Sequence, residues 1–138
     1  YLTRSFFDIV HKNMRDDILL VVAKRKNRYI AAALNFIGKD ALFGRYWGCL
    51  EHHTFLHYEL CYYQAIEYAL KHKLRKIEAG AQGEHKLSRG YLPMITNSMH
   101  WFLNERFSEA VGEYVNQEKK LVQKQYHEML RQTPFKNS

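Results

Sequence analysis

The fold is decided by residues 18–50, which read ILLVVAKRKNRYIAAALNFIGKDALFGRYWGCL. Two runs rich in Val, Ile, Leu and Ala, 18–23 and 29–37, are separated by a polar tract, a pattern typical of a β-hairpin. A turn that begins at Gly38 then leads into a third strand over 41–50, which carries aromatic residues and glycines. The sequence therefore predicts three consecutive antiparallel strands.

Helical segments surround these strands. Apolar residues recur at helical spacing over 2–14 and again over 55–72. A strand at 76–81 follows too far from the third strand for a hairpin, so we expect it to lie parallel to a neighbour. Asn104 can cap a long amphipathic helix. The predicted fold class is mixed α/β (α+β), with a mostly antiparallel sheet flanked by helices.

Length and composition limit the class of protein. The chain has 138 residues, 46% of them apolar and 25% charged, which excludes disorder and predicts a single domain over 1–138. Residues 104–138 are expected to form a long C-terminal helix and tail. No apolar run approaches the ~18 residues that span a membrane. Two cysteines are too few for a disulfide scaffold, which favours a cytoplasmic protein. Because the chain begins with Tyr1 inside a helical pattern, we expect it to be part of a longer protein.

The net charge of +7 permits an anionic partner. The densest basic run comprises Lys24, Arg25, Lys26 and Arg28, and it coincides with the predicted hairpin turn. A solvated loop is the favoured interpretation of this run, with nucleic-acid binding as the alternative.

Glu59 is expected to project into the apolar arc of the helix over 55–72. A buried carboxylate needs a cation, several hydrogen-bond donors or a raised pKa. Two interpretations stay open at this point. One is a structural salt bridge to Arg45, Lys86 or Arg89, and the other is a role in an active site.

The densest polar segment is 80–90, which reads GAQGEHKLSRG. Its glycines allow the backbone to approach a ligand, Lys86 and Arg89 could hold an anion, and Glu84 or His85 could move protons. A solvated loop is the alternative. If Glu59 faces the sheet, we expect it to meet Lys86 or Arg89 near the C-terminal end of the preceding strand.

Three other groups of residues favour structural roles. His52, His53 and His57 lack a matching set of ligands, so no metal site is predicted. Cys61 is expected to be an inert packing thiol. Core packing is favoured over base stacking for the aromatic set, which comprises Phe43, Tyr46, Trp47, Tyr62, Tyr63 and Trp101.

Several blocks resemble, in order and spacing, the motifs of the FemAB-like family of predicted N-acyltransferases. The blocks are GRYWG at 44–48, HYELCYYQ at 57–64, GAQGEHK at 80–86, RGYLP at 89–93 and SMHW at 98–101. The resemblance implies a GNAT-like acyltransferase fold, present in two copies, of which this chain is most of the second. It also implies acyl transfer to an amine, since relatives move an aminoacyl group from charged tRNA onto peptidoglycan precursors and ordinary GNAT enzymes use acetyl-CoA.

The chain departs from the ordinary GNAT pattern after the third strand. Those enzymes hold the CoA pyrophosphate with a glycine-rich loop at a helix N-terminus, whereas residues 49–54 here read CLEHHT. No cofactor is therefore assigned, and acyl-CoA stays an open alternative to a donor held by Lys86 and Arg89.

The resemblance and the residue chemistry together give a set of candidate sites. Catalytic candidates are Glu59, Glu84 and His85. Candidates for binding the substrate or acyl donor are Arg45, Tyr62, Gln82, Gly83, Lys86, Arg89 and His100. Expected partners are a charged tRNA or CoA ester, an amine acceptor such as a cell-wall precursor, and the N-terminal GNAT-like half of the longer protein. The alternative function is a non-catalytic domain that binds an anionic polymer or tRNA. An apolar face left open in this chain is expected to promote self-association.

Overall fold

The computed structural model describes residues 2–80 and 83–135. In chain order the elements are α1 (Arg4–Met14), η1 (Arg15–Asp17), β1 (Ile18–Arg25), β2 (Arg28–Ile37), β3 (Ala41–Cys49), α2 (Leu56–Tyr58), η2 (Glu59–Tyr63), α3 (Gln64–Lys71), β4 (Lys76–Glu78), η3 (Glu84–Arg89) and α4 (Glu105–Arg131). Elements η1 and η3 are 3₁₀-helices and η2 is a π-helix. The chain divides into two compact units, 1–82 and 83–138, each of which is described by itself.

The first unit is built on a four-stranded sheet in the order β1-β2-β3-β4. Strand β2 pairs antiparallel with β1 and with β3, and β4 pairs with β3 in parallel, as predicted. Lys26 and Asn27, between β1 and β2, both have positive φ angles, as in the two-residue type I′ turn that matches the twist of a hairpin. The predicted fold class, a mixed sheet with flanking helices, is confirmed.

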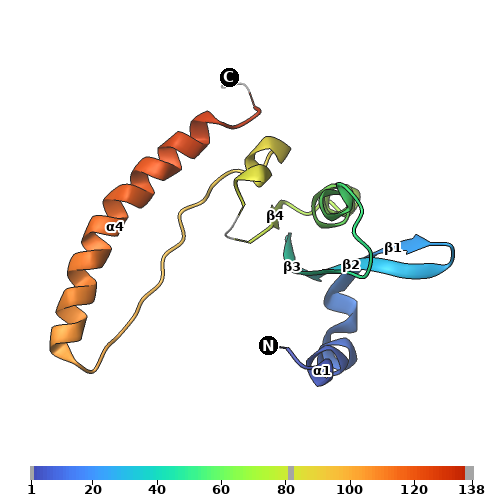
Figure 1. The fold of residues 1–138 in the computed structure, drawn as a ribbon, viewed down its shortest axis with the longest axis horizontal. Coiled ribbons are helices and arrows are strands. Elements are labelled where there is room, and N and C mark those ends of the chain that lie inside the picture. The colour runs from blue at the N-terminus through green and yellow to red at the C-terminus, as the bar shows by residue number, and fades with distance from the viewer. Residues whose placement is uncertain (1, 81–82, 136–138) are drawn as a thin grey trace. The chain divides into compact units, whose positions relative to one another are not determined.

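The two faces of this sheet are covered by different helices (Figure 1). On one face, Leu56, Leu60 and Cys61 pack against Ala31 and Ala33 of β2. On the other face, the rings of Phe6 and Phe7 of α1 meet the ring of Tyr46 edge-on, at centroid distances of 6.3 and 6.1 Å. Small alanine side chains on β2 let the α2–α3 segment approach the sheet closely, which explains the alanine run in the sequence.

The second unit consists of η3, an extended segment over 91–103 and α4 (Figure 1). The side chain of Asn104 accepts a hydrogen bond from the backbone N–H of Phe107 at 3.1 Å, so the predicted cap is confirmed. Among the described residues, no helix is both long enough and apolar enough to cross a membrane.

Element boundaries differ from the predictions at a few places. The first helix begins at Arg4 rather than at residue 2, and β4 ends at Glu78, short of the predicted residue 81, which lies outside the described residues. The predicted continuous α-helix over 55–72 is interrupted by the π-turn of η2. The single domain over 1–138 stays a prediction.

Candidate functional site

Strands β3 and β4 part at Gly44. Their parallel pairing joins Ala41–Phe43 to Lys76–Glu78, and among the described residues β3 has no further partner on that side as it continues to Cys49. A Cβ atom at Gly44 would lie 3.5 Å from the carbonyl oxygen of Glu78 and 3.6 Å from Oδ1 of Asn35. Gly44 therefore lies against the end of β4 at the point where the two strands separate, and a Cβ atom there would be in ordinary van der Waals contact.

Arg45 is the extra residue of a β-bulge. In the β2–β3 register Leu34 is opposite Tyr46 and Asn35 is opposite Gly44, so Arg45 has no residue opposite it. Its guanidinium lies 5.8 Å from the centre of the Tyr46 ring. Bulges redirect side chains and are frequent next to active sites. The GRYWG motif thus encodes both the strand separation and an exposed, redirected arginine.

A pocket of about 360 Å³ lies beside the C-terminal end of β3 and the loop into α2. Its walls are formed by Trp47, Cys49, Glu51, His52, His53, Thr54, Phe55, Leu56, His57 and Tyr58. Three histidines and three aromatic rings contribute to one concave surface, a composition suited to a planar group.

A cluster of packed aromatic rings supports the wall of this pocket. The His57 ring meets Trp47 and Tyr62 edge-on, at centroid distances of 5.3 and 5.4 Å, and Tyr58 stacks on Tyr62 at 6.2 Å. Tyr62 is buried, so it contributes packing rather than an exposed binding surface. Phe55 has a φ angle of 67°, a conformation that is strained for an aromatic residue and that is often found at functional sites.

One carboxylate connects the pocket to the β1–β2 hairpin. Glu51 accepts a hydrogen bond from Arg25 Nη1 at 2.9 Å, and its Oε2 lies 3.3 Å from His53 Nε2. These contacts, with His53 as the larger cause, lower the pKa of Glu51 below its ordinary value. Glu51 therefore carries its charge over a wider pH range than an isolated glutamate.

The predicted burial of Glu59 is wrong. Glu59 is exposed at the start of the π-helix, and its Oε1 accepts a hydrogen bond from Gln64 Nε2 at 2.8 Å. Within residues 2–80 Glu59 forms no ion pair, so the salt bridge to Arg45, one of the interpretations left open by the sequence, is not formed. The π-turn changes the rotation between residues 59 and 64, which a constant step of 100° per residue did not anticipate.

In the second unit, Gly83 and His85 form a tight turn at the start of η3. Gly83 has a φ angle of 107°, and a Cβ at that position would lie 2.6 Å from Cε1 of His85. The imidazole folds back over the glycine, and the positive φ angle is one that glycine adopts without strain. The order Gly-Glu-His in the motif thereby lets the ring of the exposed His85 lie over Gly83.

Basic side chains of η3 lie close to the backbone of the Gly83–His85 turn. Arg89 Nη1 donates a hydrogen bond to the carbonyl of His85 at 2.6 Å, and the Ser88 hydroxyl donates to that carbonyl at 2.9 Å. Partial burial lowers the pKa of Lys86. A cation that has lost part of its hydration gains more from an anionic ligand than a fully solvated one does.

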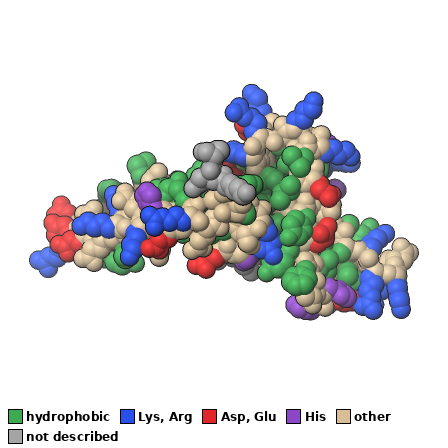
Figure 2. Space-filling model, turned by 90° about the horizontal axis from the view of Figure 1, so that it is seen from above, with side chains coloured by type: hydrophobic (Ala, Val, Ile, Leu, Met, Phe, Trp, Pro, Cys, Tyr) green, Lys and Arg blue, Asp and Glu red, His purple; other side chains and the backbone are tan. Residues whose placement is uncertain are grey.

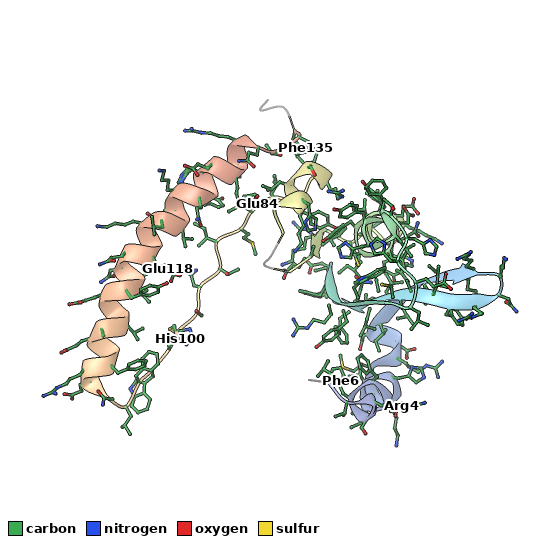
Figure 3. All side chains as sticks on the ribbon, viewed as in Figure 1. Arg4, Phe6, Glu84, His100, Glu118 and Phe135 are labelled. Carbon is green, nitrogen blue, oxygen red and sulfur yellow. The ribbon has the colours of Figure 1, made fainter. Side chains whose placement is uncertain are left out.

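The remaining predicted residues are dispersed. Glu84 lies on η3 and His100 on the extended segment, as Figure 3 shows, and His100 Nε2 is 3.0 Å from the Ser98 hydroxyl. Gln82 lies outside the described residues. The expected meeting of Glu59 with Lys86 or Arg89 stays a prediction, because these residues belong to different units. No set of three His, Cys, Asp or Glu side chains in the described ranges has the geometry of a metal site.

Sequence reasoning missed the pocket wall formed by Glu51, Phe55 and Trp47. The histidines were noticed only as metal ligands, and loop 49–54 only as the place of an absent glycine-rich loop. The signal that could have revealed the pocket is the cluster of Trp47, His53, Phe55 and His57 around the end of a strand.

Comparison with known proteins supports one relationship. A family model, FemAB-like, described as peptidoglycan biosynthesis/recognition, matches residues 1–137. No curated protein and no solved structure matches the chain. The match runs through the bulge-forming GRYWG block, the π-helical block and the Gly83–His85 turn. Since it covers nearly the whole chain, the chain belongs to the FemAB-like family of peptidoglycan biosynthesis/recognition.

Proposed function

We propose that this chain is part of an N-acyltransferase that transfers an acyl or aminoacyl group to an amine, with a cell-wall precursor as the acceptor. The observation that carries the proposal is the family match over residues 1–137. Membership in a peptidoglycan family favours aminoacyl transfer, because amide bonds to amino acids are the chemistry by which a cell-wall precursor can be extended.

In the proposed reaction the acceptor nitrogen attacks the activated carbonyl carbon. A C–N bond forms, and the C–O bond of an aminoacyl ester or the C–S bond of a thioester breaks. The attacking amine loses a proton to a base, and the leaving alcohol or thiol gains one. Glu59, Glu84 and His85 are the candidate bases, and all three are exposed and therefore accessible to an amine.

The geometry supports a role for Glu59 in particular. Its carboxylate is oriented by a hydrogen bond from Gln64 and forms no ion pair within residues 2–80. The carboxylate is therefore placed to accept a proton from an amine. It also opens a π-helix, a local structure that costs stability and is frequent at functional sites. The Gln64–Glu59 hydrogen bond spans five residues, and the π-turn brings these two side chains together.

Lys86 and Arg89 are proposed to hold the anionic part of the donor, either the phosphates of a tRNA end or those of CoA. The lowered pKa of Lys86 favours this assignment, since an anion would restore the stability of its charged form.

The test uses the natural full-length protein with charged tRNA and with a CoA ester as donors. Glu59→Gln, Glu84→Gln and His85→Gln are compared with Glu67→Gln, a matched change on an exposed residue of α3. A general base contributes about 10²- to 10⁴-fold, so one of the three variants should lose at least that much turnover. Because Glu59 is exposed, Glu59→Gln should change the free energy of unfolding by less than about 0.5 kcal/mol.

If all three variants keep full turnover with both donors, the catalytic assignment fails. If Glu59→Gln loses activity only in proportion to a fall in melting temperature, Glu59 is structural rather than catalytic.

A further inference from the structure

The pocket beside the end of β3 has an exposed and strained aromatic ring in its wall. Phe55 lines this pocket and is 72% exposed, although its side chain is entirely apolar. Its φ angle of 67° lies in the left-handed region, which is unfavourable for an aromatic residue. Neither burial nor a relaxed backbone therefore accounts for a phenyl ring at this position.

Two further rings support Phe55. The ring of Tyr58 lies against that of Phe55, with centroids 6.1 Å apart and planes inclined by only 24°. Tyr58 in turn lies nearly parallel to the buried Tyr62, at 6.2 Å and 28°. Phe55 is thus the most exposed of three roughly parallel rings that lead into the core. An exposed ring held in this way is a platform on which a planar ligand can stack.

The same wall offers a hydrogen-bond acceptor. Glu51 lines the pocket, and its contacts with Arg25 Nη1 at 2.9 Å and His53 Nε2 at 3.3 Å are both made through Oε2. Among the described residues, no hydrogen bond reaches its Oε1. Because His53 and Arg25 lower the pKa of Glu51, the carboxylate is ionised at neutral pH. Such an oxygen repels an anion and attracts an N–H donor.

A planar group with N–H donors at its edge has the chemistry of an amino-bearing nucleobase. Adenine, cytosine and guanine each carry an exocyclic amino group, from which a carboxylate can accept a hydrogen bond. Proteins that bind unpaired bases combine stacking on aromatic side chains with hydrogen bonds to base edges. Both donors considered above contain such bases, in the unpaired CCA end of tRNA and in the adenine of CoA.

We propose that this pocket binds an amino-bearing base of the acyl donor, which stacks on Phe55 and donates a hydrogen bond from its amino group to Glu51. The identity of the donor rests on the proposed function. The pocket volume of about 360 Å³ falls within the range of ~300 to 1,000 Å³ that ligand sites occupy. Tyr58 directly precedes Glu59, so the base site and one candidate catalytic carboxylate belong to the same helical segment.

The experiment titrates the natural full-length protein into a labelled RNA hairpin that ends in CCA, followed by fluorescence anisotropy, and into CoA, followed by calorimetry. Phe55→Ala should weaken binding of the donor that occupies the pocket by about 5- to 150-fold, the loss expected for one stacked base. Phe55→Trp keeps a ring and should retain binding. Phe107→Ala makes the same truncation at a ring that is 54% exposed on α4, and it should leave the affinity unchanged.

Base identity tests the hydrogen bond to Glu51. An RNA hairpin that ends in UUU presents carbonyl oxygens in place of amino groups, so the unmodified protein should bind it about tenfold more weakly than the CCA hairpin. 4′-Phosphopantetheine, which lacks the adenine of CoA, is the corresponding comparison for CoA. Glu51→Gln supplies an amide that can donate as well as accept, so the preference for CCA over UUU should shrink. A residue that only supports the loop would change the affinity for both hairpins equally.

Dependence on Phe55 and Glu51 with the RNA hairpin assigns the pocket to the CCA end, and the same dependence with CoA assigns it to adenine. The proposal is overturned if Phe55→Ala binds both donors as tightly as the unmodified protein does, or if Phe107→Ala weakens binding equally. It is also overturned if only muramyl dipeptide, a fragment of a cell-wall acceptor, depends on Phe55 for binding. Turnover with charged tRNA and a CoA ester decides the proposed function separately, because binding of uncharged RNA or of CoA involves no acyl transfer.

Discussion

At the scale of single residues, Glu51 gives a pH-dependent stability. Its pKa in the folded chain is lowered by His53 and Arg25, so folding favours the ionised carboxylate. This contribution is fully present above the ordinary pKa of glutamate, and it is lost as the pH falls through the lowered value. Glu51→Gln should therefore reduce the melting temperature near neutral pH, and the difference from the unmodified chain should vanish in acid.

The measurement is a series of thermal melts of both proteins from acid to neutral pH. Glu67→Gln serves as the control, and its melting temperature should follow that of the unmodified chain at every pH. A Glu51→Gln deficit that persists unchanged in acid would show that the side chain acts through its shape rather than its charge.

Glu59 shows where residue-level prediction from sequence stops. Its candidate role came from its type and its neighbours in the motif, and both are visible in the sequence. Its exposure was predicted wrongly, because a helical wheel assumes one rotation per residue and η2 departs from that rotation. The contact between Glu51, Arg25 and His53 was equally inaccessible, since Arg25 and Glu51 are 26 positions apart and are joined only by the sheet.

At the scale of elements, strand β3 provides the first unit with a fully buried apolar side chain. Leu42 has 0% of its surface exposed and lies opposite Ile37 of β2 and Ile77 of β4. Leu42→Ala leaves a cavity between three strands and should lower the free energy of unfolding by about 2 to 5 kcal/mol. Urea denaturation followed by circular dichroism measures this change.

Leu50→Ala makes the same chemical change just beyond the end of β3, at a side chain that is 80% exposed. It should alter the free energy of unfolding by less than about 0.5 kcal/mol. Equal losses in the two variants would contradict the assignment of Leu42 to the core.

Most elements were predictable, for physical reasons that lie in adjacent residues. The hairpin was visible because a polar tract separates two aliphatic runs, and the cap of α4 because Asn104 precedes an amphipathic pattern. The bulge at Arg45 was not, because it depends on the partner strand as much as on β3 itself. The early end of β4 likewise depends on where β3 and β4 separate, which no local pattern encodes.

At the scale of the whole molecule, the net charge of +7 is compatible with the alternative function, the binding of an anionic polymer or tRNA. Figure 2 shows Lys and Arg side chains on several parts of the chain, with apolar side chains beside them. The densest basic run is exposed at the β1–β2 turn, where Lys26 and Asn27 have positive φ angles. Binding of RNA at this hairpin would therefore be electrostatic and would involve a small number of phosphates.

We expect binding to deacylated tRNA to weaken with salt, with a shallow slope of roughly one counterion per phosphate contact. The double change Lys24→Glu and Lys26→Glu should reduce both the affinity and that slope, in filter-binding assays at several salt concentrations. The matched change Lys119→Glu and Lys120→Glu on α4 is the control. An equal effect of both pairs would mean that total charge, and not the hairpin, governs binding.

The π-turn has a consequence for how the motif tolerates insertion and deletion. A π-turn is equivalent to an α-helix into which one residue has been inserted, so the segments on either side of it differ in phase by about 100°. Removing one residue between Glu59 and Tyr63 would restore a regular helix and rotate His57 away from either Trp47 or Tyr62. The number of residues in the HYELCYYQ block thus determines the directions in which its side chains point. A one-residue deletion there would lower the stability of the fold more than most substitutions would.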